Sequence, residues 1–235
     1  MEKLSINEIR ERFDQNVERF SNLDTGQETV IDAKLCLELI TDAAKATVPN
    51  AKKLLDIGCG AGNYTIKTLQ KLPNLDCTLI DLSLPMLNKA NERIGELTTG
   101  NIETIQGDIL ELPIAENEYC IVMAGAVLHH LRTDEDWYSV FKKVYCSLKP
   151  NGSFWICDLI SHAIPSIQQL FERNYGEFLE KLGGKEYQQH VFDYIAKEDS
   201  PRSLLFQTNL LKEVGFKHIE VLHKNSCFAA FGAIK

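Results

Sequence analysis

Residues 54 to 62 read Leu-Leu-Asp-Ile-Gly-Cys-Gly-Ala-Gly, an apolar run that closes on an acid and then places glycine at positions 58, 60 and 62. Glycine has no side chain and accepts positive φ angles, so alternating glycines after a buried strand predict a sharp turn with accessible backbone. A ligand can lie against such a turn, and we expect a nucleoside. A dinucleotide fingerprint would have its third glycine at position 63, which is Asn63 here, so the spacing argues against NAD or FAD.

Strand and helix patterns alternate along the chain around this turn. Strands are predicted at 53–57, 77–81, 102–106, 119–124 and 153–158, and helices at 63–71, 84–95 and 135–148. This alternation specifies a doubly wound α/β fold, a mostly parallel Rossmann-like sheet that binds its ligand at the carboxyl ends of the strands. Two further β patterns, 217–223 and 226–234, joined at Lys224-Asn225, predict a hairpin and hence an antiparallel strand.

The segments outside this core have helical patterns. Residues 5–20 carry apolar residues at helical spacing, a break follows at Asp24-Thr25-Gly26-Gln27, and a second helix is predicted at about 28–46. Residues 161–200 show helical segments broken by Pro165, Gly176, Gly183-Gly184 and Ser200-Pro201, before a last helix at 203–214. We expect a single domain, 1–235, made of N-terminal helices (1–50), a ligand-binding core (51–160), a helical cap (161–200), and the last helix with the hairpin (201–235).

The bulk composition predicts an intracellular protein. The 235 residues carry a net charge of −8 and begin without a signal pattern, and no apolar run approaches the roughly 18 residues that cross a membrane. Seven cysteines without a CxxC pair favour reduced thiols and argue against zinc. Because binding to a phosphate backbone needs Lys and Arg, the acidic balance argues against nucleic acid. We expect a cytoplasmic protein with no membrane contact and no metal, and a homodimer is left open.

Acidic residues follow two further predicted strands. Asp81 ends the second strand, 23 residues after Gly58, where a carboxylate can accept hydrogen bonds from both ribose hydroxyls. Leu82 would then lie against an adenine face. Asp108 follows the third strand and can accept from an adenine amino group, while Ile109 packs on the other side of the ring. These residues predict an adenosine pocket.

The remaining strand ends supply supporting and catalytic candidates. Asp56 ends the first strand and can organise the glycine turn, and Ala124 at the end of the fourth strand leaves room for a group approaching from above. Histidines after the fourth strand, such as His129 and His130, can also simply bond the loop backbone, and Asp158 can cap the segment that follows it. The candidates for a general base near the strand ends are His129, His130, Asp158 and His162.

On these motifs the chain resembles the class I S-adenosylmethionine-dependent methyltransferases. The match covers about residues 51–160 and the final hairpin, and it is carried by Asp56-Ile57-Gly58-Cys59-Gly60-Ala61-Gly62, Ile80-Asp81-Leu82-Ser83 with Met86-Leu87, Gly107-Asp108-Ile109 and Leu148-Lys149-Pro150-Asn151-Gly152. The resemblance implies a seven-stranded sheet with an antiparallel last strand, S-adenosylmethionine as cofactor and S-adenosylhomocysteine as product. It implies cofactor contacts from Asp56, Gly58, Cys59, Gly60, Gly62, Asp81, Leu82, Asp108, Ile109 and Ala124.

The second half of the chain resembles a narrower group, the one that contains carboxy-S-adenosylmethionine synthase. The likeness is carried by the ending Asn225-Ser226-Cys227-Phe228-Ala229-Ala230-Phe231-Gly232 and by the aromatic-rich 161–200 segment. That synthase holds its extra carboxylate with an arginine in this segment. Here Phe192 stands near that position, and Lys197 and Arg202 do not align with it, which favours ordinary S-adenosylmethionine.

The resemblance implies in-line transfer of a methyl group to a small-molecule acceptor enclosed by the N-terminal helix and the cap. Because a sulfonium methyl is already activated, positioning dominates and can contribute roughly 7 to 11 kcal/mol. Phe13 and Phe20 are expected to pack, and Gln27 is a weaker candidate for a lid. A second core would have the same composition as a cap over the acceptor. The cap aromatics expected to touch the acceptor are Phe171, Tyr175, Phe178 and Phe192.

Three other functions stay open. A tRNA-modifying enzyme is disfavoured, because Ala-Gly-Ala-Val stands at 124–127 where the amine-methylating enzymes carry Asn-Pro-Pro-Tyr or Asp-Pro-Pro-Tyr. An enzyme like carboxy-S-adenosylmethionine synthase would need another group to hold the extra carboxylate. A non-catalytic module would bind the cofactor without turnover.

Overall fold

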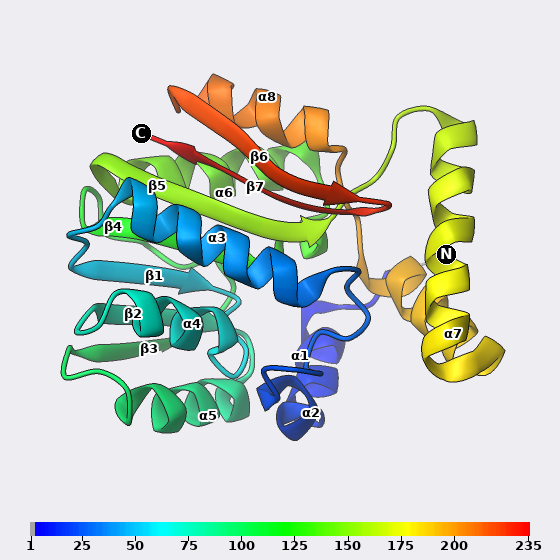
Figure 1. The fold of residues 1–235 in the computed structure, drawn as a ribbon, viewed down its shortest axis with the longest axis horizontal. Helices are drawn as coiled ribbons and strands as arrows, with labels where there is room; N and C mark the ends of the chain where they lie inside the picture. The colour runs from blue at the N-terminus through cyan, green and yellow to red at the C-terminus, as the bar shows by residue number, and fades with distance from the viewer. Residues whose placement is uncertain (1–2) are drawn as a thin grey trace.

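The computed structural model describes residues 3–235 and centres on one seven-stranded sheet (Figure 1). The strand order is β3-β2-β1-β4-β5-β7-β6. The strands are β1 (Lys53–Ile57), β2 (Asp76–Asp81), β3 (Ile102–Gln106), β4 (Tyr119–Gly125), β5 (Leu148–Leu159), β6 (His218–Asn225) and β7 (Phe228–Ile234). Neighbours from β3 to β5 pair in parallel, whereas β7 runs antiparallel to both β5 and β6. The predicted doubly wound fold with an antiparallel last strand is confirmed.

The strand order changes direction at β1, because β2 and β3 lie on one side of this strand and β4 and β5 on the other. This strand pairs with β2 on one side and β4 on the other, so Ile57 is the Cα partner of both Ile80 and Ala124. The connections that follow β1 and β4 leave toward opposite edges of the sheet, and the carboxyl ends of these two strands therefore frame a crevice. The glycine turn at 58–62 starts at this crevice.

Helices cover both faces of the sheet. In β1, Leu54 packs into one buried cluster and its neighbour Leu55 into another, because successive side chains of a strand point to opposite faces. The Leu54 face is covered by α3 (Ala33–Thr47), α4 (Asn63–Lys71) and α5 (Leu84–Gly95), and the Leu55 face by α6 (Asp134–Ser147) and α8 (Leu204–Val214).

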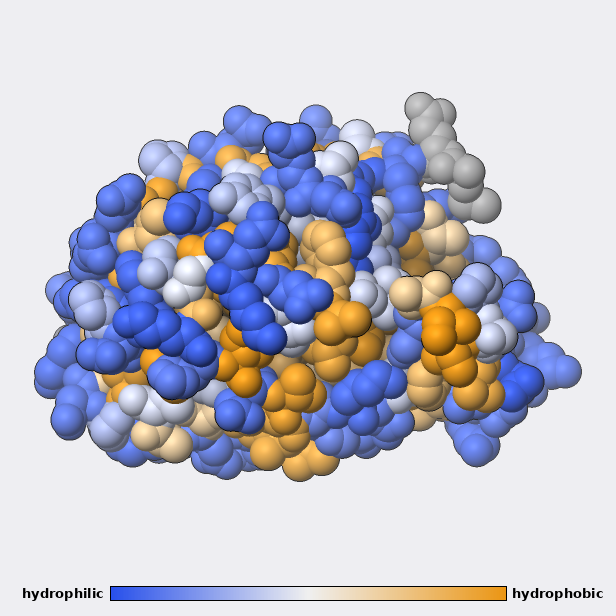
Figure 2. Space-filling view, turned by 90° about the horizontal axis from the view of Figure 1, so that it is seen from above, coloured by the Kyte–Doolittle hydropathy of each residue, from blue (hydrophilic) through white to orange (hydrophobic). Residues whose placement is uncertain are grey.

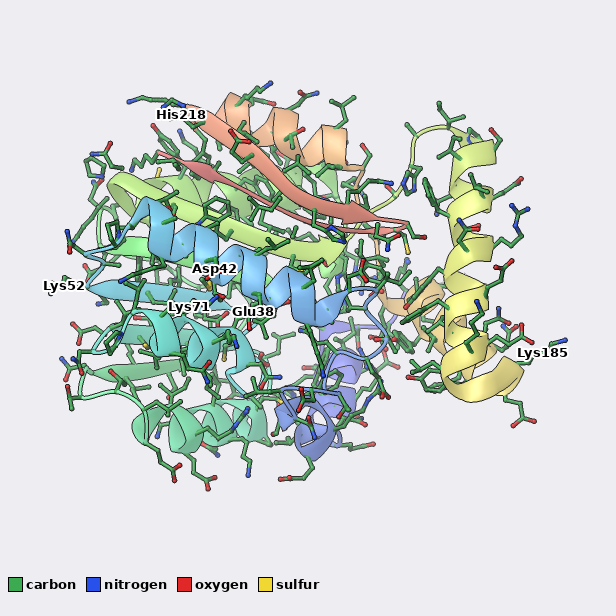
Figure 3. The ribbon with its side chains drawn as sticks, in the orientation of Figure 1. Glu38, Asp42, Lys52, Lys71, Lys185 and His218 are labelled. Carbon is green, nitrogen blue, oxygen red and sulfur yellow. The ribbon has the colours of Figure 1, made fainter. Side chains whose placement is uncertain are left out.

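Ion pairs at the surface join α3 to α4. Lys71 Nζ lies 2.8 Å from Glu38 Oε2 and 2.5 Å from Asp42 Oδ1, and Figure 3 shows the three side chains between the two helices. Exposed pairs of this kind contribute about 0 to 1 kcal/mol. The apolar contacts beneath them therefore hold these helices on the sheet.

The helix predicted over 5–20 is interrupted, so that prediction is wrong in part. Two helices, α1 (Ile6–Asp14) and α2 (Val17–Ser21), replace it. Ser5 starts α1 through a capping box with Glu8. Asn16 donates its side-chain amide to the Arg12 carbonyl oxygen at 2.7 Å, and this bond competes with the backbone pattern that would continue the helix.

The helix α3 begins at Ala33 rather than at about residue 28. Asp32, directly before it, has a left-handed φ of 59°. Its carboxylate accepts a hydrogen bond from the Asn225 amide at 2.8 Å and lies 2.8 Å from His223 Nε2. These contacts with β6 hold Asp32 out of helical geometry, and the helix starts one residue later.

The 161–200 segment forms one long helical element, α7 (Pro165–Glu198), which stands beside the sheet in Figure 1 and bends at Gly184 (φ 83°, ψ 178°). The predicted break at Gly176 is wrong, because the helix continues through this residue. A Cβ atom at Gly176 would lie 2.5 Å from the Gln188 side chain and 3.3 Å from that of Phe192. The glycine costs a helix about 1 kcal/mol, and here it lets the two arms of α7 pack closely.

The terminal hairpin turns at Ser226-Cys227, two residues later than predicted. Asn225 pairs with Phe228, and Ser226 takes a φ of 52°, as two-residue hairpin loops require. The Ser226 hydroxyl donates to the Phe171 carbonyl oxygen at 3.2 Å. A contact with α7 therefore supports the observed turn, and no local sequence signal reports it.

The surface on the α8 and β6 side is mainly hydrophilic, with apolar residues in separate patches, one of them on the lobe formed by α7 (Figure 2). Leu170 and Leu182 are among the exposed apolar residues of α7. Within residues 3–235, no helix is long and apolar enough to cross a membrane.

Candidate active site

A cavity of about 180 Å³ lies outside the carboxyl ends of β1, β2, β4 and β5. The remaining wall comes mainly from the N-terminal helices, the 26–30 segment, the short helix η1 (Leu128–His130), both arms of α7, and Phe228 of β7. Ligands of open α/β sheets bind at this edge. The cavity is therefore the candidate site.

The glycine turn and the end of β2 form one end of the cavity. The Gly60 N–H donates to Asp81 Oδ2 and the Ser83 N–H donates to Asp81 Oδ1, each at 2.8 Å. Burial raises the pKa of Asp81, and these backbone N–H groups oppose the rise. The predicted cofactor residues on the cavity wall are Gly58, Cys59, Gly60, Asp81 and Leu82.

Backbone geometry requires glycine at positions 58 and 60, where φ is +63° and +51°. A Cβ atom at Gly58 would lie 2.3 Å from the Val127 side chain, whereas one at Gly60 would meet nothing within 4 Å. Gly58 is thus needed for both conformation and packing. Gly60 is needed for conformation, and the open space beside it is available to a ligand.

The other predicted cofactor residues do not lie on the cavity wall in this structure, and two of them shape the turn from behind. Asp56 is buried, its Oδ2 accepts from the Thr65 hydroxyl at 2.6 Å, and burial raises its pKa to about 7. Gly62 precedes α4 with a φ of 83° and packs against Ile94 of α5. The five residues behind the wall are Asp56, Gly62, Asp108, Ile109 and Ala124.

The other three of these five residues, Asp108, Ile109 and Ala124, stabilise the fold near the cavity. Asp108 Oδ1 accepts from the Leu110 N–H at 2.9 Å, which orders the turn after β3. Ile109 and Ala124 are buried in the core on the α6 face of the sheet.

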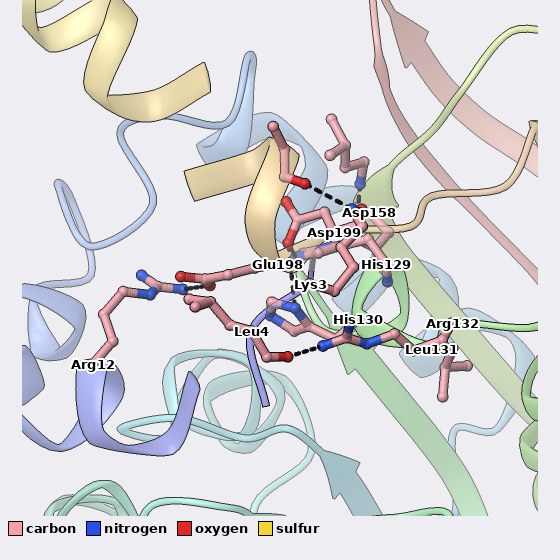
Figure 4. A network of polar contacts seen from close by, with 12 residues as sticks. Lys3, Leu4, Arg12, His129, His130, Leu131, Arg132, Asp158, Glu198 and Asp199 are labelled. Carbon is pink, nitrogen blue, oxygen red and sulfur yellow. Dashed lines mark hydrogen bonds and ion pairs between the residues drawn. The ribbon is translucent and has the colours of Figure 1, made fainter. Parts of the chain in front are cut away.

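A cluster of histidine and aspartate side chains lies at the other end of the cavity (Figure 4). His129 and His130 come from η1 and Asp158 from the end of β5, and all three line the cavity, whereas His162 does not. His129 Nδ1 contacts Asp158 Oδ1 directly, and the His129 N–H donates to Asp158 Oδ2 at 3.2 Å. Burial lowers the pKa of His129, but Asp158 and Asp199 outweigh it and raise the pKa to about 9.

Asp199, directly after α7, joins this cluster and is not among the predicted residues. Its Oδ1 lies 3.7 Å from His129 Nε2 and 3.3 Å from His130 Nδ1. Burial acts to raise the pKa of Asp199, but the two histidines and Arg12 lower it. The nearby Ser200-Pro201 marks only the end of a helix. No local signal places this acid beside residues about 70 positions earlier.

The N-terminal helices close the cavity. Phe13 stands edge-on to His130 with ring centroids 6.0 Å apart, so it faces the site as well as packing. Gln27 also lies on the wall and accepts a hydrogen bond from the Tyr64 hydroxyl at 3.0 Å. The side chains of α1 and α2 on the wall are Arg12, Phe13, Arg19 and Phe20.

One of the four predicted cap aromatics lies on the wall. Tyr175 lines the cavity, and its hydroxyl donates to the Thr29 carbonyl oxygen at 2.9 Å. Phe178 and Phe192 pack on Tyr175, with ring centroids 6.3 and 5.7 Å away. These two form the second core that was the alternative reading of the cap composition.

The aromatic wall is completed by two residues that are not among those four. Tyr194 of α7 and Phe228 of β7 line the cavity beside Tyr175. Phe171 lies outside it, under Lys224 Nζ at 4.1 Å from the ring centroid. Both arms of α7 therefore contribute to this wall, Tyr175 from before the bend at Gly184 and Tyr194 from after it.

Sequence comparison connects this fold and cavity with known proteins. Residues 54–152 match the model of a family described as a methyltransferase domain. A demethylmenaquinone methyltransferase of Listeria monocytogenes is 28% identical over 148 residues, which are 62% of this chain and 61% of that protein. The chain thus spans about three fifths of the length of this curated relative.

Solved structures with the same fold include methyltransferases. Human N-acetylserotonin methyltransferase, solved in complex with S-adenosylmethionine, has a TM-score of 0.61 at 16% identity and covers 94% of this chain and 56% of its own. An O-methyltransferase family protein from Burkholderia thailandensis has a TM-score of 0.61 at 14% identity and covers 94% and 62%. The chain therefore has the fold of these methyltransferases, and its residues 54–152 are similar to the methyltransferase domain family.

Proposed function

We propose that this protein transfers a methyl group from S-adenosylmethionine to a small-molecule acceptor held in the same cavity. The observation that carries the proposal is the continuity of this cavity. It has the glycine turn and Asp81 at one end and the His129, His130 and Asp199 cluster with aromatic walls at the other. A cofactor and an acceptor bound at these two ends would meet without an intervening barrier.

At the cofactor end, Asp81 would accept hydrogen bonds from both ribose hydroxyls, as an acid at this position does in related sheets. Gly58 and Gly60 would lie under the nucleoside, and Leu82 against the adenine. Asp108 and Ile109 would reach the adenine from behind the wall only after a local shift. Asp56 and Gly62 would act indirectly, through the shape of the turn.

At the acceptor end, the protein has to place a nucleophile in line with the methyl carbon. Proximity and orientation of this kind can contribute roughly 7 to 11 kcal/mol, because they replace a bimolecular encounter by a unimolecular step. We assign contact with the polar atom of the acceptor to His129 and His130, and we assign the positioning of the His129 ring to Asp158. The sulfur takes the electron pair of the broken bond and leaves as S-adenosylhomocysteine.

The walls favour an acceptor with an aromatic ring. Phe13, Tyr175, Tyr194 and Phe228 line this part of the cavity, and aromatic walls hold planar apolar groups by offset or edge-on contacts. The name of the Listeria relative, demethylmenaquinone methyltransferase, agrees with such a choice. Reduced quinones and simple phenols are therefore the first acceptors to test.

The cofactor assignment is tested by calorimetric titration of S-adenosylhomocysteine into the wild type, Asp81→Ala and the surface control Asp42→Ala. We expect Asp81→Ala to weaken binding at least about 10-fold, equivalent to 1.4 kcal/mol, because two hydrogen bonds to a carboxylate are lost. Asp42→Ala should match the wild type. Equal affinity in all three proteins would rule out the ribose assignment. Turnover is tested with tritiated methyl donor and the aromatic acceptors.

A further inference from the structure

Three metal-ligating side chains converge on the acceptor end of the cavity. One ligand atom from each of His129, His130 and Asp199 lies within 4.8 Å of the other two, and all three residues line the cavity. We infer that His129 Nε2, His130 Nδ1 and Asp199 Oδ1 form a binding site for one divalent ion of the zinc class. This inference departs from the expectation of a metal-free protein.

Two of the three separations between these atoms are close to those of tetrahedral coordination. Asp199 Oδ1 lies 3.7 Å from His129 Nε2 and 3.3 Å from His130 Nδ1. Zinc binds nitrogen and oxygen ligands at about 2.0 to 2.1 Å, so ligand atoms in a tetrahedral site are about 3.3 to 3.4 Å apart. The His129 and His130 ligand atoms lie within 4.8 Å of each other, so an ion that binds both has to draw the two rings together.

Two of the three atoms lack any other partner. His130 Nδ1 and Asp199 Oδ1 are buried, and within residues 3–235 neither makes a hydrogen bond, since their 3.3 Å contact is not aligned for one. Buried polar atoms are satisfied in the great majority of cases, and an exception calls for an explanation such as an ion. A bound cation would satisfy both atoms at once.

The contact between His129 and Asp158 is one that metal-bound histidines commonly make. Asp158 Oδ1 contacts His129 Nδ1 (Figure 4). A carboxylate on one ring nitrogen fixes the tautomer and the ring orientation, and leaves the other nitrogen as the ligand. His129 Nε2 is that other nitrogen, and it faces Asp199.

The neighbouring cationic side chains are engaged elsewhere. Arg12 forms an ion pair with Glu198, and Arg132 donates to the Leu4 carbonyl oxygen. Lys3 Nζ donates to the carbonyl oxygens of Ala196 and Asp199, which leaves the Asp199 carboxylate without a lysine or arginine partner. The carboxylate charge next to the two imidazoles is thus available to a metal ion.

The donor set selects the kind of ion. Two imidazole nitrogens and one carboxylate suit zinc and similar transition metals, whereas magnesium and calcium prefer oxygen ligands. Three protein ligands leave a fourth position open, as in catalytic zinc sites. This position faces the cavity, where an acceptor oxygen would lie.

The role of the ion, unlike the site itself, rests on the proposed function. A metal ion makes a bound hydroxyl more acidic, so an acceptor hydroxyl would release its proton to solvent. The oxygen would then form a bond with the methyl carbon while the carbon–sulfur bond breaks and sulfur keeps the electron pair. His129 would in this case contact the acceptor through the ion.

The site is tested by calorimetric titration of Zn²⁺ into chelator-treated protein. We expect one equivalent to bind to the wild type, and His130→Gln and Asp199→Asn to bind at least 10-fold more weakly. His223→Gln is the matched control, because it removes another histidine that lies 2.8 Å from an aspartate oxygen, and its affinity should equal that of the wild type. Mg²⁺ should give no binding. Equal zinc affinity in the wild type and both site variants would overturn the inference.

Two further readouts keep the test decisive. Co²⁺ bound to the wild type should show visible d–d absorption without a sulfur-to-metal charge-transfer band, and a strong band of that kind would overturn the inference by showing that cysteine holds the metal. Titration of S-adenosylhomocysteine into the same metal-free protein separates the two proposals. If it binds while zinc does not, the metal site is wrong and the proposed function is unaffected.

Discussion

Asp81 is held in place by the chain itself. Its two carboxylate oxygens accept N–H groups from Gly60 and Ser83, one on each side. A carboxylate oxygen has more than one acceptor position, so ribose hydroxyls can add to these bonds without breaking them. The residue is therefore oriented before a ligand arrives, and little ordering entropy has to be lost on binding.

Asp56, behind the turn, makes the stability depend on pH. Its pKa is raised by burial to about 7 in the folded protein from about 3.9 in an unfolded chain. A raised pKa means that the folded state binds the proton more tightly, so the contribution to stability is present below about pH 4 and is lost as the pH rises to 7. Across that window the free energy of unfolding should fall by up to about 4 kcal/mol through this group.

Urea unfolding between pH 4 and 7 measures this effect. In Asp56→Asn the group cannot titrate, so the decline seen in the wild type should flatten. Asp193→Asn removes an exposed carboxyl from α7 and should keep the slope of the wild type. If Asp56→Asn and wild type decline in parallel, Asp56 titrates normally and the burial argument fails.

At the scale of single residues, the sequence identifies the cavity residues that follow a strand directly, and it misses those that only tertiary contacts bring to the cavity. Gly58, Gly60 and Asp81 follow from local pattern, because each sits at a strand end whose geometry is set by its neighbours. Asp199 and Arg12 reach the site from opposite ends of the chain. Only the docking of α1 on α7 puts them there, and neither segment contains a signal for the other.

Among the elements, α1 and α7 are joined by a buried charge. Arg12 pairs with Glu198, whose side chain is 1% exposed against 27% for the arginine. The guanidinium also stacks near the rings of Phe13 and Tyr194, at 4.4 and 5.1 Å. The pair thus links α1 to the C-terminal end of α7.

Arg12→Ala should destabilise the protein by about 1 to 3 kcal/mol, because it leaves a buried carboxylate without its partner. The double variant Arg12→Ala/Glu198→Gln should recover part of this loss, since no charge is then stranded. Lys34→Ala is the control, as it removes a pair exposed on both sides. Urea unfolding gives the values, and an Arg12→Ala protein as stable as Lys34→Ala would contradict the prediction.

Element boundaries were predictable where local chemistry sets them. α5 begins after Ser83, whose side chain accepts the Met86 N–H, and its predicted bounds of 84–95 agree with the structure. The start of α3 and the turn of the hairpin depend on contacts between Asp32 and β6 and between Ser226 and α7. Such contacts join segments far apart in sequence, so helical spacing and turn residues did not reveal them.

At the scale of the whole molecule, β7 fits tightly between β5 and β6 in the sheet. Gly232 lies against Trp155, and a Cβ atom there would come within 2.3 Å of the indole and 2.4 Å of the Phe154 carbonyl oxygen. Because one neighbour is backbone and the other is a buried ring, neither can move aside easily for an added methyl group. The antiparallel strand predicted from the hairpin pattern thus lies against β5 at a residue that has no side chain.

Gly232→Ala should therefore lower the free energy of unfolding by about 1 to 3 kcal/mol or more, as overpacking of a core does. Gly95→Ala is the matched control, because its new methyl would meet only Ile102, at 3.9 Å, and alanine favours helices. Thermal unfolding followed by circular dichroism compares the two. A Gly232→Ala protein as stable as Gly95→Ala would show that β5 and β7 can separate freely.

A small core around α7 contains Tyr175, Leu179 and Val191, and it includes Leu159 of β5 and Phe228 of β7. Substitutions inside this core can reshape the acceptor wall while the strands and the glycine turn stay as they are. Descendants of this chain thus have a route to new acceptors in which each step keeps the cofactor end intact. If the proposed function is correct, divergence in such a lineage should concentrate in α7, and a library that varies this helix alone tests whether the acceptor preference can be changed.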